Sequence, residues 1–147
     1  MIRRAGAGDA DAVADVFTPS FESLTFLPRL HTHEQQRAWI RDVVLTRSEV
    51  WVAEEGGRIV GFAALGDAVL EHLYVHPDAQ GRGVGGALLE QAKACRPAGF
   101  RFWVFQANDR ARGFYERRGC TVVELTDGSR NEERVPDALY EWRPADV

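Results

Sequence analysis

The sequence has only two cysteines, Cys95 and Cys120, and they form no C-x-x-C pair. This scarcity argues against a disulfide scaffold and against a cysteine-based metal or redox motif, so we expect no metal site. Basic residues are not in excess either: the formal net charge is −4, which argues against a nucleic-acid partner. No apolar run reaches the roughly 20 residues of a membrane span. The first 17 residues lack the apolar segment of a signal peptide, so we expect a cytoplasmic protein without a membrane partner.

The composition is that of a globular protein. Hydrophobic residues make up 45% of the 147 positions and charged residues 27%. A chain of this length buries roughly 70% of its unfolded surface, enough to fold without covalent cross-links. No repeat, low-complexity tract or linker interrupts it. We therefore expect a single domain over residues 1–147.

The hydrophobic pattern predicts an α/β fold with the order β-α-α-β-β-β-α-β-α-β-β. We expect a helix capped by Gly8 or Asp9, an irregular stretch over 18–30, and a second helix opened by a capping box of Thr32 and Gln35. Two further helices are predicted over 84–95 and 109–118, the latter ended by Gly119. The predicted strands cover 2–5, 49–55, 58–65, 68–76, 100–107, 120–125 and 138–143. The strands at 68–76 and 100–107 should be parallel neighbours joined by a right-handed crossover.

The most informative stretch is HPDAQGRGVGG, residues 76–86, between a predicted strand and a helix. A helix N-terminus preceded by glycines presents free N–H groups and binds phosphate. The spacing Gly81-x-Gly83-x-x-Gly86 matches the dinucleotide fingerprint, which would predict a nucleotide-dependent oxidoreductase. That fingerprint needs an acid at the end of the next strand, where this chain has Gln106 and Asn108. The Gly-Lys-Ser/Thr of a P-loop is missing as well. A dinucleotide site is therefore the weaker hypothesis.

The same stretch also reads as Gln80-x-x-Gly83-x-Gly85, and a second block, NDRARGFYERRGC, follows at 108–120. Together the two blocks resemble the GNAT superfamily of acetyl-coenzyme A-dependent N-acyltransferases. The first matches that family's strand, Gln/Arg-x-x-Gly-x-Gly/Ala loop and helix, and the second its Asn-x-x-Ala and Phe-Tyr pattern. The order of elements fits over residues 2–143. The resemblance implies a GNAT-like mixed, mainly antiparallel sheet of about seven strands with about four helices, in which a parallel pair splays apart at a cofactor cleft.

The resemblance further implies acetyl-coenzyme A as the cosubstrate. Backbone N–H groups over 81–86 would hold its pyrophosphate, where a Cβ would block the close approach. Arg82 would pair with a phosphate or remain a solvated loop residue. Strand residues 73–75 would pair through their backbone with the pantetheine arm, at a bulge that opens the cleft. Asn108 would bond the cofactor or cap the helix that follows it. The predicted binding set is Leu73, Tyr74, Val75, Gln80, Gly81, Arg82, Gly83, Val84, Gly85, Gly86, Asn108 and Phe114.

Two side chains are the candidates for catalysis. Tyr115 matches the family tyrosine and would act as a general acid towards the leaving thiolate; the alternative is a half-buried aromatic on an amphipathic helix. Glu71 is the predicted base. His72 points to the opposite face by strand alternation, so only one of the two can face the acceptor, and a water-mediated route stays open. Direct transfer forms no acyl-enzyme and uses neither cysteine.

The predicted function is transfer of an acetyl group from acetyl-coenzyme A to a primary amine of a small molecule or peptide, in a ternary complex. The resemblance places the acceptor near the first two helices and the last hairpin. The loop over 126–137 would attract a cationic amine or remain a solvated loop; its carboxylates are Asp127, Glu132, Glu133 and Asp137. The alternative function is a non-catalytic acetyl-coenzyme A-binding regulatory module, against which the retained Tyr115 argues. A homodimer would cover exposed edge strands.

Overall fold

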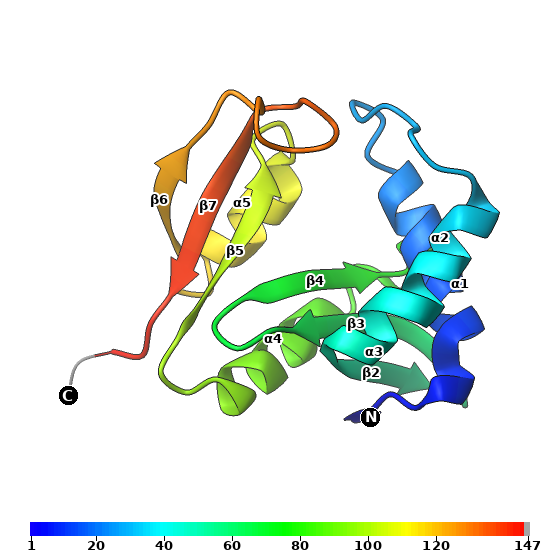
Figure 1. The fold of residues 1–147 in the computed structure, drawn as a ribbon. Coiled ribbons are helices and arrows are strands. Elements are labelled where there is room, and N and C mark those ends of the chain that lie inside the picture. The colour runs from blue at the N-terminus through cyan, green and yellow to red at the C-terminus, as the bar shows by residue number, and fades with distance from the viewer. Residues whose placement is uncertain (146–147) are drawn as a thin grey trace.

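The computed structural model describes residues 1–145, and the strands in this range form two antiparallel sheets that separate from one another (Figure 1). The first sheet has the order β1 (Ile2–Arg4), β2 (Glu49–Glu55), β3 (Arg58–Leu65) and β4 (Leu70–Val75). The second has the order β5 (Phe100–Phe105), β7 (Asp137–Trp142) and β6 (Thr121–Leu125). The predicted strand order along the chain and the mainly antiparallel pairing are confirmed.

The predicted parallel pair, β4 and β5, is reduced to a single point of contact. An isolated parallel bridge joins Val69 to Arg101, whose N–H donates to the Ala68 carbonyl at 3.0 Å. Beyond it the two strands diverge, which splits the expected mixed sheet in two (Figure 1). A β-bulge contributes to the separation, because Glu71 is an extra residue between two successive pairs of the β3–β4 ladder. A bulge bends its strand and increases the local twist. The resemblance placed this bulge at 73–75, two residues further along.

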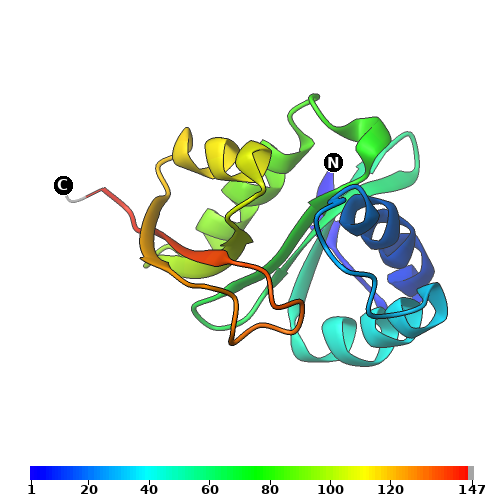
Figure 2. The ribbon, with the colours of Figure 1, turned by 90° about the horizontal axis from the view of Figure 1, so that it is seen from above.

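The helices cover opposite faces of the first sheet (Figure 2). On one face lie α1 (Ala10–Glu22) and α2 (His33–Trp39), which continues through a π-helical turn (Ile40–Val44) into the short α3 (Leu45–Arg47). On the other face lies α4 (Val84–Cys95), whose core contacts extend to β5 and to α5 (Asp109–Glu116) on the second sheet. The two faces therefore have separate hydrophobic cores, and the divergence of β4 from β5 lies between them.

The capping box is confirmed. The Thr32 hydroxyl accepts the Gln35 N–H at 3.1 Å, and the Gln35 side chain accepts the Thr32 N–H at 2.8 Å. The cap predicted for the first helix differs. Asp9 is at the N-cap position, but its carboxylate accepts the N–H of Gly6 at 2.7 Å and pairs with Arg3 at 2.9 Å. A short 3-10 turn (Ala7–Asp9) precedes the helix instead.

The irregular stretch predicted over 18–30 is wrong in its first part, because α1 continues to Glu22 with Pro19 inside it. Proline removes one helical hydrogen bond, so another interaction must offset the loss. The buried stripe of α1 continues past it: the Phe17 ring packs on Phe21 at 5.3 Å and meets Tyr74 of β4 at 5.1 Å. Burial of these rings outweighs the missing donor, and the irregular segment is confined to residues 23–32.

Candidate active site

A cleft lies where β4 and β5 diverge. It is lined from β4, β5, the start of α5 and the loop after α1, by Leu24, Leu70, Glu71, His72, Leu73, Tyr74, Phe102, Trp103, Val104, Phe105, Asn108, Ala111 and Tyr115. Both predicted catalytic side chains and three of the predicted binding residues therefore meet in one place. The remaining predicted binding residues are not part of this lining. They are Val75 at the end of β4, Gln80 to Gly86 in the loop after β4 and the first turn of α4, and Phe114 on α5.

The edge of β4 that faces this cleft carries free peptide groups. His76, just past β4, donates its N–H to the Val60 carbonyl at 2.8 Å. In an antiparallel ladder only alternate residues exchange hydrogen bonds with a given neighbour. Tyr74, two residues before His76, therefore pairs with β3, whereas the peptide groups of Leu73 and Val75 point away from β3. Of the three residues predicted to pair with a ligand through their backbone, only Leu73 and Val75 have peptide groups free to do so. Tyr74 lines the cleft through its side chain.

One of these peptide groups, the Val75 carbonyl, already forms hydrogen bonds within the protein. The Val75 carbonyl accepts hydrogen bonds from the Ser20 hydroxyl at 2.8 Å and from the Gln80 side chain at 3.1 Å. Ser20 is 5% exposed and was not found from the sequence, because nothing local connects α1 with the end of β4. Gln80 consequently ties the glycine-rich loop to β4. The N–H and carbonyl of Leu73 and the N–H of Val75 have no hydrogen-bond partner among residues 1–145 and remain open towards the cleft.

The glycine-rich loop ends in an exposed helix N-terminus. Gly83, the N-cap of α4, is in the left-handed region with φ 84°, and Gly81 has φ 80°. The first hydrogen bond into α4 runs from the Ala87 N–H to the Gly83 carbonyl at 3.0 Å. The N–H groups over 84–86 precede it and have no partner within the helix. They point along the positive end of the helix dipole, an arrangement that binds phosphate.

At two of the glycine positions, close packing against the end of α5 and the residues after it leaves little room for a side chain. A Cβ on Gly85 would lie 3.3 Å from the Phe114 ring, and one on Gly86 would lie 3.4 Å from the Arg118 guanidinium. That guanidinium stacks 4.0 Å above the Phe114 ring. These glycines let α5 pack against α4. Arg82, the predicted phosphate partner, forms an ion pair with Glu55 at 3.1 Å.

Tyr115 extends from α5 into the cleft and is 7% exposed. Its ring packs against Phe102 at 4.4 Å and Phe114 at 5.0 Å. Burial, with a smaller contribution from Tyr74, raises the pKa of the Tyr115 phenol above its usual value. Its hydroxyl forms no hydrogen bond with any residue in the range 1–145. The phenol is therefore protonated at neutral pH and has a proton to donate.

Asn108 has one of the two roles that were left open, that of a helix cap, and its bond to the cofactor stays a prediction. Its side-chain oxygen accepts the Ala111 N–H at 3.2 Å, which makes it the N-cap of α5. It also lines the cleft. The oxygen is occupied by the cap, so the amide nitrogen is the group left to meet a ligand.

Glu71 and His72 both line the cleft but differ in their surroundings. Glu71 is exposed at the bulge. The His72 ring lies edge-on against Trp39 of α2, with ring centres 5.0 Å apart, and 6.3 Å from the Tyr74 ring. Burial lowers the pKa of His72 to about 4. The imidazole is therefore neutral at physiological pH.

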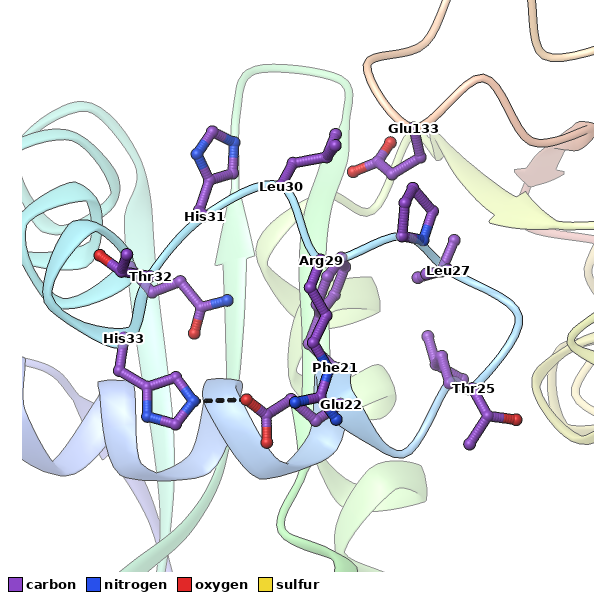
Figure 3. Close-up of a pocket in the computed structure, with 13 residues that line it drawn as sticks. Phe21, Glu22, Thr25, Leu27, Arg29, Leu30, His31, Thr32, His33 and Glu133 are labelled. Carbon is purple, nitrogen blue, oxygen red and sulfur yellow. Dashed lines mark hydrogen bonds and ion pairs between the residues drawn. The ribbon is translucent and has the colours of Figure 1, made fainter.

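Figure 3 shows a second pocket, which has a volume of about 330 Å³. Leu24 lines both this pocket and the cleft, so the two adjoin. It is lined by the end of α1, the segment up to the start of α2, and Glu133 from the loop between β6 and β7. Two side-chain hydrogen bonds frame it: one joins His33 to Glu22, and one joins His31 to Glu132 at 2.5 Å. The second of these joins the two chain segments that form the pocket.

Of the four loop carboxylates predicted to attract an amine, only Glu133 lines this pocket. Asp137 is 8% exposed and accepts hydrogen bonds from Thr126 and Asn131 inside the loop. Asp127 accepts the Ser129 N–H at 2.9 Å. Glu133 forms no ion pair within the described part of the chain, and its charge contributes to the raised pKa of Tyr74. Its carboxylate is thus close to the junction of pocket and cleft.

Residues 1–145 contain no group of three or more histidine, cysteine or acidic side chains placed to hold a metal ion. None of the helices in that same range has both the length and the apolar character needed to cross a membrane.

Comparison with known proteins agrees with this geometry. A family model described as an acetyltransferase (GNAT) domain matches residues 46–121, a range that includes the glycine-rich loop and α5. The chain is 28% identical to the peptidyl-lysine N-acetyltransferase YiaC of Escherichia coli (strain K12), over 97% of this chain and 96% of that protein. Its fold is similar to that of apo YjaB from Escherichia coli, with a TM-score of 0.80 at 24% identity over 99% and 98% of the two chains.

The fold is also similar to that of the PaiA N-acetyltransferase of Thermoplasma acidophilum in complex with coenzyme A, with a TM-score of 0.76 at 21% identity over 98% of each chain. The matched domain, the two divergent sheets and the loop before α4 lead to one conclusion: the chain belongs to the GNAT acetyltransferase family and is an acyltransferase.

Proposed function

We propose that the protein transfers an acetyl group from acetyl-coenzyme A to a primary amine by direct attack in a ternary complex. The observation that carries this proposal is a single cleft in which the free edge of β4 and the protonated phenol of Tyr115 meet, with the N-terminus of α4 beyond it. The structural relative from Thermoplasma acidophilum holds coenzyme A, which supports coenzyme A chemistry for this chain as well.

The residues at the cleft and the glycine-rich loop suit acetyl-coenzyme A, the acetyl donor. Free N–H groups at the first turn of α4 suit a pyrophosphate. The open peptide groups of Leu73 and Val75 suit the amides of a pantetheine arm, which would add to β4 as a strand does. Asn108 presents its amide nitrogen, and Phe114 packs beside the loop at Gly85. Arg82 would exchange its pair with Glu55 for a phosphate.

The reaction requires a general acid for the leaving sulfur and a base for the amine nitrogen. As the amine nitrogen attacks the thioester carbonyl, the C–N bond forms, the C–S bond breaks, and the sulfur leaves with the electron pair. Tyr115 donates its phenolic proton to that sulfur, as a positioned general acid. The nitrogen must lose one proton to a base, for which the sequence predicted Glu71.

The acceptor would occupy the pocket lined by Glu133. A carboxylate without an internal partner suits an amine that carries a further positive charge or lies in a basic context. YiaC is named a peptidyl-lysine N-acetyltransferase, which supports a lysine side chain of a peptide as the acceptor here. A polyamine-like small molecule fits the same charge requirement.

The test is the release of free thiol from acetyl-coenzyme A in the presence of lysine peptides, free amino acids and polyamines. Amine-dependent thiol release is the expected result. Calorimetry that finds tight binding of acetyl-coenzyme A but no thiol release with any amine would support the alternative, a non-catalytic regulatory module. Tight binding of NAD in its place would overturn the proposal.

A homodimer remains a prediction. The outer strand of the second sheet, β6, exposes Val122, Val123 and Leu125 by 43%, 45% and 59%. Apolar edge strands are commonly covered by a partner. Sedimentation velocity at two protein concentrations measures this directly, and a monomer throughout would contradict it.

A further inference from the structure

We infer that His72, and not Glu71, is the side chain that accepts the proton of the attacking amine. The inference rests on the proposed acetyl transfer and names the base that the sequence left open between neighbouring residues. Four observations support it: the face of β4 on which His72 lies, the unused nitrogens of its ring, its protonation state, and the orientation of Glu71.

His72 lies on the acceptor side of β4. Its ring contacts Trp39 of α2, and Tyr74, which follows it on the same face, contacts Phe17 of α1. Leu73 belongs to the opposite face and packs with the core under α4, the helix whose N-terminus suits the donor. The pocket that would hold the acceptor is formed by α1 and the segment leading into α2. An amine that moves from this pocket into the cleft therefore reaches the face that carries His72.

The ring nitrogens of His72 have no hydrogen-bond partner among residues 1–145, although the ring is largely buried. Every fully enclosed polar side-chain atom in the described range has a partner, so the unpaired nitrogens of His72 are accessible from outside the core. His72 lines the cleft, so a ligand or a water molecule there can hydrogen-bond to them. The edge-on contact with Trp39 fixes the plane of the ring.

The imidazole is in the protonation state that the reaction needs. A neutral imidazole has one nitrogen that accepts a hydrogen bond. Burial alone lowers the pKa of His72, and no charged group in the described residues contributes to the change. Tyr74, the nearest titratable neighbour on the same face, is itself held neutral by burial. The ring is therefore neutral at pH 7 and can accept a proton without first losing one, and the same burial makes it a weaker base than an exposed imidazole.

Glu71 lines the cleft at its closed end. Its carboxylate lies over the turn between β3 and β4, where a Cβ on Gly66 would be 2.9 Å from the Glu71 Oε1 atom. That turn is next to the bridge from Val69 to Arg101, the closed end of the cleft. The bulge at Glu71 thus takes the carboxylate out of the regular alternation of β4 and towards the end furthest from the divergence.

The proton balance is complete with His72 in this role. The amine attacks as the neutral free base, after its ammonium proton has passed to water. One proton then passes from the amine nitrogen to His72 as the C–N bond forms, and one passes from Tyr115 to the departing sulfur as the C–S bond breaks. Water then carries the proton from His72 back to Tyr115. The net change moves one proton from the amine to the thiol and needs no other reactant.

The test compares His72→Phe with wild type in the thiol-release assay. Phenylalanine keeps an aromatic ring against Trp39 but has no nitrogen. We expect kcat to fall at least about 100-fold, as for the loss of a general base, with the KM for acetyl-coenzyme A within about twofold. Asp67→Asn, in the exposed turn, is the matched control and keeps the wild-type kcat. Equal melting temperatures and equal coenzyme A affinities establish that the fold is intact.

A rescue experiment separates a base from a packing residue. In His72→Ala, added free imidazole should raise kcat at least about tenfold, an effect expected of a missing base and not of lost packing. His72→Gln replaces His72→Phe if the latter does not fold, with the same expected loss. A His72→Phe enzyme that retains kcat within threefold of wild type, with Glu71→Gln inactive, would return the base to Glu71. A wild-type protein that releases no thiol with any amine would overturn the proposed function and this inference together.

Discussion

The half-buried imidazole of His72 predicts a specific loss of stability in acid. Its pKa is 6.5 when the ring is in water and about 4 in the folded protein, because burial disfavours the charged form. Below pH 6.5 the unfolded chain therefore binds a proton that the folded chain does not. The free energy of unfolding consequently decreases as the pH decreases. The contribution is absent above pH 6.5 and grows as the pH falls from 6.5 to 4.

The magnitude follows from the size of the pKa change. Each tenfold change in a protonation equilibrium corresponds to about 1.36 kcal/mol, so the full change would cost close to 3 kcal/mol at pH 4. The ring keeps partial contact with the open cleft, which reduces the expected loss to about 2–3 kcal/mol. A domain with a total stability of roughly 5–15 kcal/mol would show this clearly.

Urea unfolding of wild type and His72→Phe, followed by circular dichroism at pH 7, 6, 5 and 4.5, measures the effect. Carboxylates such as Asp9 and Glu141, whose pKa values are lowered by ion pairs, also cause a loss of stability in acid, but equally in both proteins. The difference between the two proteins therefore isolates His72. We expect wild type to lose more stability than the variant, by about 1 kcal/mol per pH unit between pH 6 and 4.5. Parallel curves for the two proteins would refute the assignment of a buried, neutral ring.

Three further predictions concern the acid, the acceptor and the glycine-rich loop. Tyr115→Phe should lower kcat about 100-fold and leave coenzyme A affinity by calorimetry unchanged; an unchanged kcat would remove Tyr115 as the acid. Glu133→Gln should raise the KM for a cationic amine about tenfold, whereas Glu132→Gln, outside the pocket lining, should change it less than twofold; equal effects would contradict a specific role for Glu133. Gly83→Ala places a Cβ at φ 84° and should lower stability by about 1–2 kcal/mol in urea unfolding, with no loss if the loop adapts freely.

The elements predicted from the sequence are those that depend on nearby residues. The capping box of Thr32 and Gln35 needs only a reach of three residues, and the turn between β2 and β3 needs only Gly56 and Gly57. The prediction failed where distant contacts decide. Helix α1 passes through Pro19 because the rings of Phe17 and Phe21 are buried on one face, an interaction that local preference does not contain.

The same distinction applies to the candidate site. Two short motifs, the glycine-rich loop and the block from Asn108 to Tyr115, were enough to identify the family, because phosphate-binding loops and helix starts are local structures. The motifs did not indicate that Ser20 would bond the end of β4, or that Glu133 alone among the four loop carboxylates would line the pocket. Those facts depend on how segments far apart in the chain meet.

The choice between Glu71 and His72 illustrates the limit most clearly. Strand alternation predicted from the sequence that only one of these two neighbouring residues faces the acceptor. The observations behind our inference for His72 came only from the tertiary structure, since the bulge at Glu71 and the contact of His72 with Trp39 arise from the packing of β4 against β3 and α2. The sequence by itself determined the family, the position of the glycine-rich loop and the order of elements, because these depend on local patterns. The divergence of the two sheets, the free edge of β4 and the orientation of its side chains required the folded chain, because each is a relation between elements that no local pattern encodes.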